Sequence, residues 1–405
     1  MSKLEKLIQQ YCPDGVEYRS LGDVCIFADG FPLKAEDIKG QGIYPVVKIG
    51  NINNGVVDEQ DCYLTSLPSK VKTSQILSGG EILVGMSGST GKTGYSVLQN
   101  AIVNQRIAII RNNDLVLNGY LKHSLVNNKF ESYCFQKGTG PQHNISKFDL
   151  LSYKIPVPPL PIQEEIVRIL DAFTELQAEL QAELQKRLQQ YEYYKWNIFE
   201  GLSCPTKHIT DVALVKARVG WQRLTTAEYQ ETGDYYLITG TDFKNGKIDF
   251  NSCVFVSKER YEMDPNIIVG KGDILITKDG TLGKVAFMAE EPNKPTTLNS
   301  GVFRIHTTDL QVSSRYLFHY FTSKYFTDFV NSVKTGSTIP HLTQQGLVSL
   351  NIPIPSLEEQ NRVVAILDRF DTLTNDLTSG LPAEMEKRRQ QYEYYRDRLL
   401  TFKRL

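Results

Sequence analysis

The sequence lacks an apolar run long enough to cross a bilayer, and its first residues lack the pattern of a secretory signal peptide. The six cysteines among 405 residues are scattered. None stands in a C-x-x-C pair, and no histidine lies beside them at zinc-ligand spacing. These absences favour a cytoplasmic protein with reduced thiols and without a membrane segment, a metal or a cofactor.

An excess of charge of one sign is also missing, because the formal net charge is −1 at pH 7. A chain of this kind has no strong overall attraction to nucleic acid, although acidic helices can still mask a local basic face. The hydrophobic fraction of 41% and the charged fraction of 22% are typical of a globular protein. The length is enough for two or three domains.

The stretch GEILVGMSGSTGKTG (80–94) resembles a phosphate-binding loop that follows a strand. A P-loop reads G-x-x-x-x-G-K-[ST], and its backbone N–H groups wrap a phosphate. Its first glycine belongs at position 86, where this chain has Met86, and Gly85 stands one residue too early. Because the motif depends on the loop length, an ATPase is the weaker interpretation and a glycine-rich turn after a strand is the stronger one.

The same stretch occurs a second time, as GDILITKDGTLGK (272–284). The second copy keeps the strand, Gly280 and the pair Gly283-Lys284, but Val285 replaces the hydroxyl of Thr93 that a P-loop needs for magnesium. Both copies therefore preserve a strand, a glycine turn and a lysine, which indicates a repeated structural loop with a basic tip.

Further pairs of segments recur in the same order, so the chain consists of two copies of one module. Each copy has a β-rich part, a proline-rich hinge and a long helix. We predict an α+β fold in which two β-rich domains form a pseudo-two-fold repeat, separated by two long helices. The predicted divisions are 1–155 with an N-terminal helical arm, 156–203, 204–352 and 353–405.

Apolar residues recur at helical spacing from 166 to 198 and again from 363 to 402. A helix of about 38 residues is about 55–60 Å long. In the second helix Gly380 and Pro382 predict an interruption, with Pro382 beginning a new segment. An insertion of about one helical turn there leaves the apolar stripes nearly aligned. We expect the two helices to pair as an antiparallel coiled coil; the alternative is that each folds back on its own β-rich part.

Related segments close each copy, and they carry a resemblance to a known family. They are IPVPPLPIQ (155–163), ILDAFTEL (169–176) and KRLQQYEYY (186–194) in the first copy, and IPIPSLEEQ (352–360), ILDRFDTL (366–373) and KRRQQYEYY (387–395) in the second. In these segments and their order, the whole chain resembles the specificity (S) subunit of type I restriction–modification systems.

The resemblance implies that each β-rich part is a target recognition domain, which reads one half of a bipartite target in double-stranded DNA. The helices would be the spacer regions that fix the gap between the halves. Two modification (methyltransferase) subunits would dock on this frame, and two restriction (motor–nuclease) subunits would join for cleavage. A repeat within one chain suits a two-part DNA site, and the differing sequences of the copies predict unequal halves.

No catalytic residue is predicted. The [DN]-P-P-[YF] motif of amino methylation is missing, and the nearest stretch, DPNI (264–267), lacks the second proline and the aromatic residue. The segments DIK (37–39) and DFK (242–244) match a nuclease motif only at chance level. Two alternatives remain: a specificity subunit of a related system whose methylation and cleavage lie in one partner chain, and a coiled-coil scaffold that binds no DNA.

Phosphate contacts need lysine and arginine, whereas base edges are read by arginine, amide and hydroxyl side chains in loops. In the first copy the candidates for DNA binding are Lys48, Asn51, Asn53, Ser87, Ser89, Lys92, Gln105, Arg106, Lys137, Gln142 and His143. In the second copy they are Arg218, Trp221, Arg223, Thr239, Lys244, Lys278, Thr281, Lys284, Ser300, Lys334, Ser337 and His341.

Each of these candidates has a structural alternative. Asn51, Asn53 and Ser89 are residue types that also shape turns, and Trp221 also suits a core. His143 and His341 stand at similar places in the two copies. The candidates for binding a partner protein are the tyrosines at the helix ends, Tyr191, Tyr194, Tyr392 and Tyr395, which also suit packing within the coiled coil.

Overall fold

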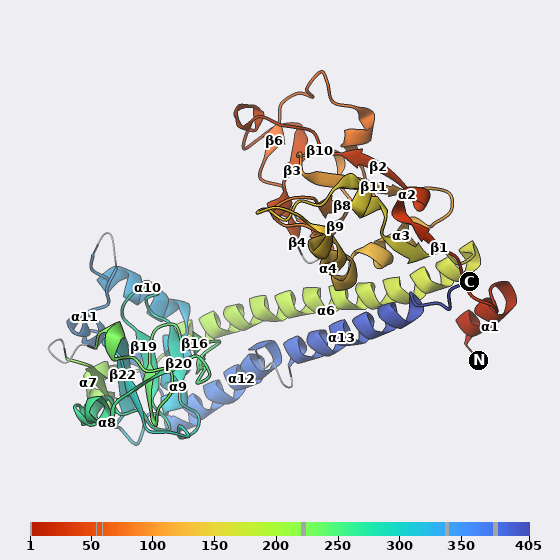
Figure 1. The fold of residues 1–405 in the computed structure, drawn as a ribbon. Helices are drawn as coiled ribbons and strands as arrows, with labels where there is room; N and C mark the ends of the chain where they lie inside the picture. The colour runs from red at the N-terminus through yellow and green to blue at the C-terminus, as the bar shows by residue number, and fades with distance from the viewer. Residues whose placement is uncertain (1, 54, 59, 220–223, 337–339, 376–379) are drawn as a thin grey trace. The chain divides into compact units, whose positions relative to one another are not determined.

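The computed structural model describes residues 2–53, 55–58, 60–219, 224–336, 340–375 and 380–405 (Figure 1). The chain divides into two units, Met1–Glu179 with Glu386–Leu405, and Leu180–Met385. Each unit contains one β-rich module together with parts of the long helices. None of the described helices is both long and apolar enough to cross a membrane.

The first unit begins with the helix α1 (Lys3–Tyr11), whose first turn is closed by a capping box between Ser2 and Glu5. The module that follows has the helices α2 (Leu21–Val24), α3 (Asn118–Leu125), α4 (Asn128–Lys137) and α5 (Lys147–Leu151). Its strands are β1 (Tyr18–Ser20), β2 (Cys25–Asp29), β3 (Tyr44–Val47), β4 (Ile52–Asn53), β5 (Gly55–Val57), β6 (Tyr63–Leu64), β7 (Ile76–Ser78), β8 (Glu81–Gly85), β9 (Thr93–Ser96), β10 (Gln99–Val103), β11 (Ile107–Asn112) and β12 (Lys154–Pro156).

The main sheet of this module has the strand order β2-β11-β8-β9-β5-β4, and a second sheet has the order β6-β3-β10-β7. Strand β8 is buried on both faces, because Ile82 and Val84 belong to the core shared with Leu121 while Leu83 belongs to the core shared with Val103. Burial on both faces explains why this strand appears in the sequence as a continuous apolar run.

The module of the second unit repeats this plan. Its helices are α7 (Ile209–Val212), α8 (Lys258–Glu262), α9 (Ser314–Phe321), α10 (Lys324–Val333) and α11 (Gln344–Val348). Its strands are β13 (Thr206–His208), β14 (Ala213–Ala217), β15 (Tyr235–Ile238), β16 (Phe243–Lys244), β17 (Lys247–Ile248), β18 (Val254–Val256), β19 (Ile274–Thr277), β20 (Val285–Phe287), β21 (Thr296–Leu298), β22 (Val302–Thr307) and β23 (Asn351–Pro353).

The sheets of the two modules share most of their strand order. The order β14-β22-β19-β20 repeats β2-β11-β8-β9, and the antiparallel pair β13-β23 repeats β1-β12. The parallel pair of β15 with β21 repeats the parallel pair of β3 with β10. The predicted repeat and the mixed α+β fold are therefore confirmed.

The long helices are α6 (Leu160–Glu200), α12 (Leu357–Asn375) and α13 (Leu381–Leu399). Helix α6 has 41 residues, which corresponds to about 60 Å at 1.5 Å per residue. Pro382 is the second residue of α13, so it begins a new helical segment as predicted.

Contacts within each unit give the direction of helix pairing. In the first unit Phe173, early in α6, stacks on Tyr395, late in α13, with ring centroids 5.4 Å apart. In the second unit Tyr191, late in α6, stacks on Phe370 of α12 with centroids 5.9 Å apart. An early residue of α6 therefore contacts a late residue of α13, and a late residue of α6 contacts the earlier helix α12. The predicted antiparallel pairing is confirmed.

A buried glutamine joins the first turn of each long helix to its own module. The side chain of Gln163 donates to the carbonyl oxygens of Leu115 (3.0 Å) and Pro158 (2.8 Å) and accepts from the backbone N–H of Leu117 (2.9 Å). Gln360 makes the same three bonds with Gln311, Pro355 and Ser313. The first turn of each long helix therefore packs on its own β-rich module, as the alternative interpretation expected. The later turns pair with another helix.

A buried histidine makes a second joint in each unit. Nε2 of His123 on α3 lies 2.9 Å from Oδ1 of Asp171 on α6, and its Nδ1 lies 2.9 Å from the hydroxyl of Tyr392. In the other unit Nε2 of His319 lies 2.7 Å from Oδ1 of Asp368. Burial lowers the pKa of His123 to about 4 and also lowers that of His319, in spite of the neighbouring carboxylates.

Candidate nucleic-acid interface

Three loops of the first module meet at the end of β8. The backbone N–H of Met86 donates to the carbonyl oxygen of Arg106 (2.8 Å), and the N–H of Ile145 donates to the carbonyl oxygen of Met86 (3.0 Å). The N–H of Gly88 donates to the carbonyl oxygen of Gln142 (2.9 Å). The β8–β9 loop is thus bonded to the β10–β11 turn on one side and to the α4–α5 loop on the other.

The second module repeats this crossing of loops at the end of β19. The N–H of Lys278 donates to the carbonyl oxygen of Gly301 (2.9 Å), and the N–H of Leu342 donates to the carbonyl oxygen of Lys278 (2.9 Å). The β19–β20 loop, the β21–β22 turn and the α10–α11 loop therefore form the second loop cluster. Both clusters present the same backbone frame with different side chains.

The β8–β9 loop does not have the geometry of a P-loop. A P-loop leads into a helix and points its N–H groups at phosphate, whereas Thr93 begins the strand β9, which pairs antiparallel with β8. The loop's own N–H groups are already donated within the protein, as those of Gly88, Ser89, Gly91 and Lys92 show. The ATPase interpretation is therefore not supported.

Most of the predicted residues of the first module lie in or beside its loop cluster. The ammonium of Lys92 donates to Oδ1 of Asn53 (2.9 Å), and the hydroxyl of Ser87 donates to Oε1 of Gln142 (3.3 Å). Exposed side chains surround these pairs: Ser89 on the β8–β9 loop, Gln105 and Arg106 on the β10–β11 turn, and Lys137 and His143 on or after α4. Lysine, arginine, amide and hydroxyl groups are thereby gathered on one edge.

Two predicted residues of this module have local roles. The ammonium of Lys48 donates to Sγ of Cys62 at 2.9 Å. Oδ1 of Asn51 accepts from the backbone N–H of Lys48 at 2.9 Å, so Asn51 shapes the turn before β4. Both residues lie on the segment between β3 of the second sheet and β4, and not on the β8–β9 loop.

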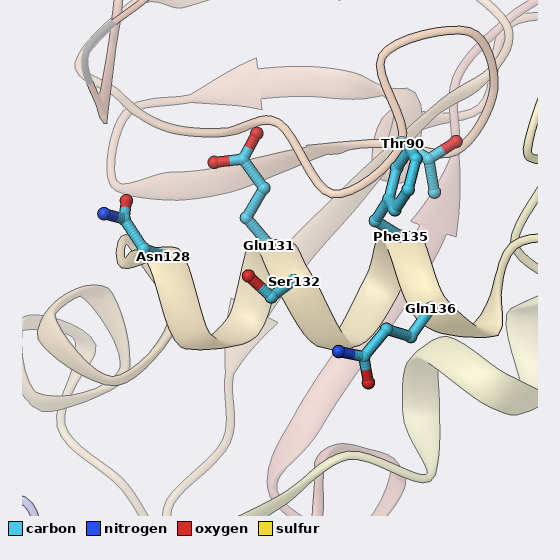
Figure 2. A pocket seen from close by; sticks show the side chains of 6 residues that line it. All are labelled: Thr90, Asn128, Glu131, Ser132, Phe135 and Gln136. Carbon is cyan, nitrogen blue, oxygen red and sulfur yellow. The ribbon is translucent and has the colours of Figure 1, made fainter.

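Phe135 is a member of the first cluster that the sequence did not indicate. Its ring is 52% exposed and stacks on His143 with centroids 4.3 Å apart. Thr90, Asn128, Glu131, Ser132, Phe135 and Gln136 line an open hollow of about 490 Å³ along α4. Figure 2 shows Thr90 of the loop next to Phe135. The carboxylate of Glu131 also lines this hollow. Because a carboxylate repels a phosphate, the hollow is unsuited to binding one.

In the second module the structure places Lys278, Thr281 and Lys284 on the β19–β20 loop and Ser300 on the β21–β22 turn. Lys334 follows α10, and His341 lies on the α10–α11 loop, where it contacts Asp279. The predicted residues Trp221, Arg223 and Ser337 lie outside the described residues.

Arg218 is a correction to the predicted set. Its side chain is only 2% exposed, and its guanidinium donates to the carbonyl oxygen of Leu298 (2.9 Å) and to the hydroxyl of Thr297 (3.2 Å). It therefore stabilises the interior of the module next to β21. Thr239 bonds the carboxylate of Asp242, and Lys244 forms an ion pair with Asp249, which turns both residues toward their own loop.

His143 and His341 are not counterparts, although they stand at similar places in the sequence. The bridge between Thr139 and Asn144 in the first module corresponds to the bridge between Thr335 and His341 in the second. Each bridge ends one residue before the one whose backbone N–H donates to the loop after the central strand, which is Ile145 in the first module and Leu342 in the second. The counterpart of His341 is therefore Asn144.

The match to known families follows this two-module division. The sequence model of a family described as the type I restriction modification DNA specificity domain matches residues 13–190 and again residues 206–387. The chain belongs to this family.

Relatives of this specificity family cover most of the chain. A protein of Haemophilus influenzae named as a type I restriction enzyme specificity subunit is 33% identical over 341 residues, which are 80% of this chain and 83% of that protein. The EcoR124I/EcoR124II specificity subunit of Escherichia coli is 32% identical over 275 residues, 66% of this chain and 67% of its own. The fold is similar to that of the crystallised S subunit from M. genitalium, with a TM-score of 0.54 at 16% identity over 96% of this chain and 97% of that one.

Membership of the specificity family assigns a non-catalytic role within a restriction–modification enzyme. Among the described residues, no group of three or more His, Cys, Asp and Glu side chains is arranged to hold a metal ion. Both loop clusters carry cations, a type of group that can contact phosphates, and amide, hydroxyl and imidazole groups, which are types that can contact base edges.

The helix tyrosines of this specificity chain divide into those that pack within the fold and those that are exposed. Tyr191 is buried on Phe370, Tyr392 bonds His123, and Tyr395 stacks on Phe173, so these three pack within the fold. Among the predicted tyrosines, Tyr194 is 46% exposed. Two tyrosines of the same repeated segments that are not in the predicted set are more exposed: Tyr193 at 64% and Tyr394 at 60%.

Proposed function

We propose that the chain is the sequence-reading subunit of a cytoplasmic type I restriction–modification complex. Each module reads one half of a bipartite target in double-stranded DNA. The paired helices fix the gap between the halves and dock two methyltransferase subunits, and restriction subunits join this assembly for cleavage. The proposed divisions are 1–155 and 204–352 for the two recognition domains, and 156–203 and 353–405 for the spacer helices.

One observation carries this proposal: the same three-loop crossing occurs in both modules while the side chains on it differ. Met86, Arg106 and Ile145 correspond to Lys278, Gly301 and Leu342. A constant frame with varied side chains is what two readers of unequal sequences need. The flanking lysines supply phosphate contacts that set the register, and the amide and hydroxyl side chains contact base edges in the major groove.

The test is methylation mapping of DNA in cells that contain the chain with its methyltransferase subunits. We expect one split motif, with two short unequal halves around a fixed gap, to lose adenine methylation when the gene is deleted. If no motif changes while the methyltransferase is active, the DNA-reading role is wrong and the scaffold interpretation is favoured. Recovery of the same motif with a single fused partner would point to the related-system alternative.

Lys284 and Lys334 provide a test of the phosphate contacts. Replacing both by alanine is expected to weaken binding equally on target and non-target DNA, and to lower the dependence of log Kd on log salt by about 1 for each lysine. The measurement is DNA affinity of the complex at several salt concentrations. Lys258→Ala on α8, where the lysine is paired with Glu262, is the matched control. A loss confined to target DNA would contradict the phosphate role.

Tyr193 and Tyr394 provide a test of methyltransferase docking. Large aromatic side chains exposed on a helix are typical anchors of protein interfaces, and these two stand at matching places in QQYEYY of the two copies. Alanine at both is expected to weaken binding of the methyltransferase subunits by about 30-fold or more, a loss of about 2 kcal/mol. Tyr11→Ala, at a tyrosine 47% exposed on α1, is the control. Unchanged affinity would exclude this face of the helices.

A further inference from the structure

Asp279 is the one carboxylate at the crossing point of the loops described in the second module. It follows Lys278, whose backbone N–H and carbonyl oxygen are both bonded to the neighbouring loops. Its side chain is 41% exposed, and that of His341, which faces it, is 51% exposed. A carboxylate is therefore held in the open, at the position where the three loops of the cluster meet.

The orientation of this carboxylate is fixed. Oδ1 lies 2.5 Å from Nδ1 of His341, whose backbone is bonded in both directions to Thr335 at 2.9 and 2.8 Å. Oδ2 faces Gly301, on which a Cβ atom would lie 3.6 Å from this oxygen, at an ordinary contact distance. One oxygen is thus used for positioning, while the other makes no hydrogen bond with the part of the chain that the structure describes.

Neither phosphate binding nor stability explains an acid here. A carboxylate repels phosphate, although Lys278, Lys284 and Lys334 around it suit a DNA backbone. A polar interaction between two exposed side chains contributes at most about 1 kcal/mol to folding. In the first module the residue that corresponds to Asp279 is the neutral Ser87, and the counterpart of His341 is the neutral Asn144. The carboxylate is therefore a property of the second module and not of the shared frame.

We propose that Asp279 determines specificity in the half-site read by the second module, by accepting a hydrogen bond from an exocyclic amino group. In the major groove only cytosine, through N4, and adenine, through N6, present such a donor, whereas guanine and thymine present oxygen acceptors that a carboxylate repels. His341 holds the carboxylate and offsets the cost of removing its charge from water. This inference rests on the proposed function and names the class of base read at one position.

The first module gives the contrast that makes the inference specific. Ser87 at the matching position carries a hydroxyl, which both donates and accepts, so it does not select amino-bearing bases in this way. We therefore expect a strict preference for cytosine or adenine at one position of one half-site only. A change of Asp279 must leave the other half-site unaltered.

The experiment measures methylation by the complete complex on a DNA library randomised over the wild-type motif. Asp279→Asn and Asp279→Ala are expected to reduce the discrimination between amino-bearing and other bases by about 10- to 100-fold at one position. Asp328→Asn, which removes the charge of an aspartate paired with Lys324 on α10, is the matched control and should leave the motif unchanged. His341→Gln is expected to weaken the same preference more mildly.

The outcomes separate this inference from the proposed function. If the wild-type complex methylates no split motif, the proposed function is wrong. If the wild-type motif is present but every position stays the same in both Asp279 variants, the role of Asp279 is overturned. An equal loss of methylation on all sequences, or failure of Asp279→Asn to fold, makes Asp279 a structural residue and also overturns it.

Discussion

Replacing Gln163 by leucine is expected to lower the free energy of unfolding of the first unit by about 3–6 kcal/mol. Leucine has a similar volume but leaves the carbonyl oxygens of Leu115 and Pro158 and the N–H of Leu117 without their partner. Each polar group buried without a hydrogen bond costs about 1–3 kcal/mol. The side chain of Gln163 is fully buried, so water cannot replace these bonds without a structural change.

The measurement is urea unfolding followed by circular dichroism, together with hydrogen exchange at the amide of Leu117. Gln181→Leu, at an exposed position of the same helix, is the control and should change stability by less than about 0.5 kcal/mol. Gln360→Leu should reproduce the loss in the second unit, because its three bonds are the same. A loss below about 1 kcal/mol in Gln163→Leu would show that the joint is held by apolar packing instead.

Acid is expected to destabilise the first unit through His123 before its exposed carboxylates are protonated. The pKa of His123 is lowered by burial to about 4, against an ordinary value of about 6.5. Between these values the unfolded chain binds a proton that the folded chain does not. Stability is therefore complete above about pH 6.5 and falls by up to about 3 kcal/mol as the pH approaches 4.

The charged groups that face His123 also affect the dependence of stability on pH. Burial by itself raises the pKa of Asp171, but the bond from His123 and the nearby ammonium of Lys122 outweigh it and lower that pKa overall. Asp171 therefore contributes stability that is present above its ordinary pKa and is lost as the pH falls below it. Asp171 raises the pKa of His123, whereas Lys122 and Arg396 lower it because they disfavour a positive charge on the imidazole.

The check is the free energy of unfolding measured between pH 7.5 and pH 4 for the wild type and for His123→Gln. The variant lacks the titrating group, so the part of the loss between pH 6.5 and 4 that belongs to His123 should disappear. His143→Gln, which removes an exposed histidine of the same module, should keep the wild-type slope. An unchanged slope in His123→Gln would show that other groups carry the acid sensitivity.

The repeat, the long helices and the two repeated glycine loops were predictable from the sequence, because each depends on a local sequence pattern. The spacing of apolar residues predicted the long helices, and the repeated segments GEILVG and GDILIT predicted the strands β8 and β19. Gln163 and Gln360 also left a signal, since both stand at the end of the repeated proline segment. Their role was missed because their bonds reach carbonyl groups more than 40 residues away.

The errors come from contacts that no local pattern records. Arg218 was chosen as a cation that could contact DNA, but its guanidinium is bonded to carbonyl and hydroxyl groups of β21 in the interior. His341 was paired with His143 by position, whereas the loop bridges pair it with Asn144. The tyrosines were chosen as a group, and only the packing of α6 against its partners separates the buried Tyr191 from the exposed Tyr193.

The crossing of the three loops has a consequence for how such a protein acquires new targets. Its hydrogen bonds join backbone groups, so they are the same whether the residue is Met86 or Lys278, Arg106 or Gly301. A point mutation on this edge changes the chemical groups offered to a ligand without rebuilding the loops that carry them. Under the proposed function, selection by a changing population of invading genomes would therefore act on one residue and one module at a time, while the half-site read by the other module stays the same.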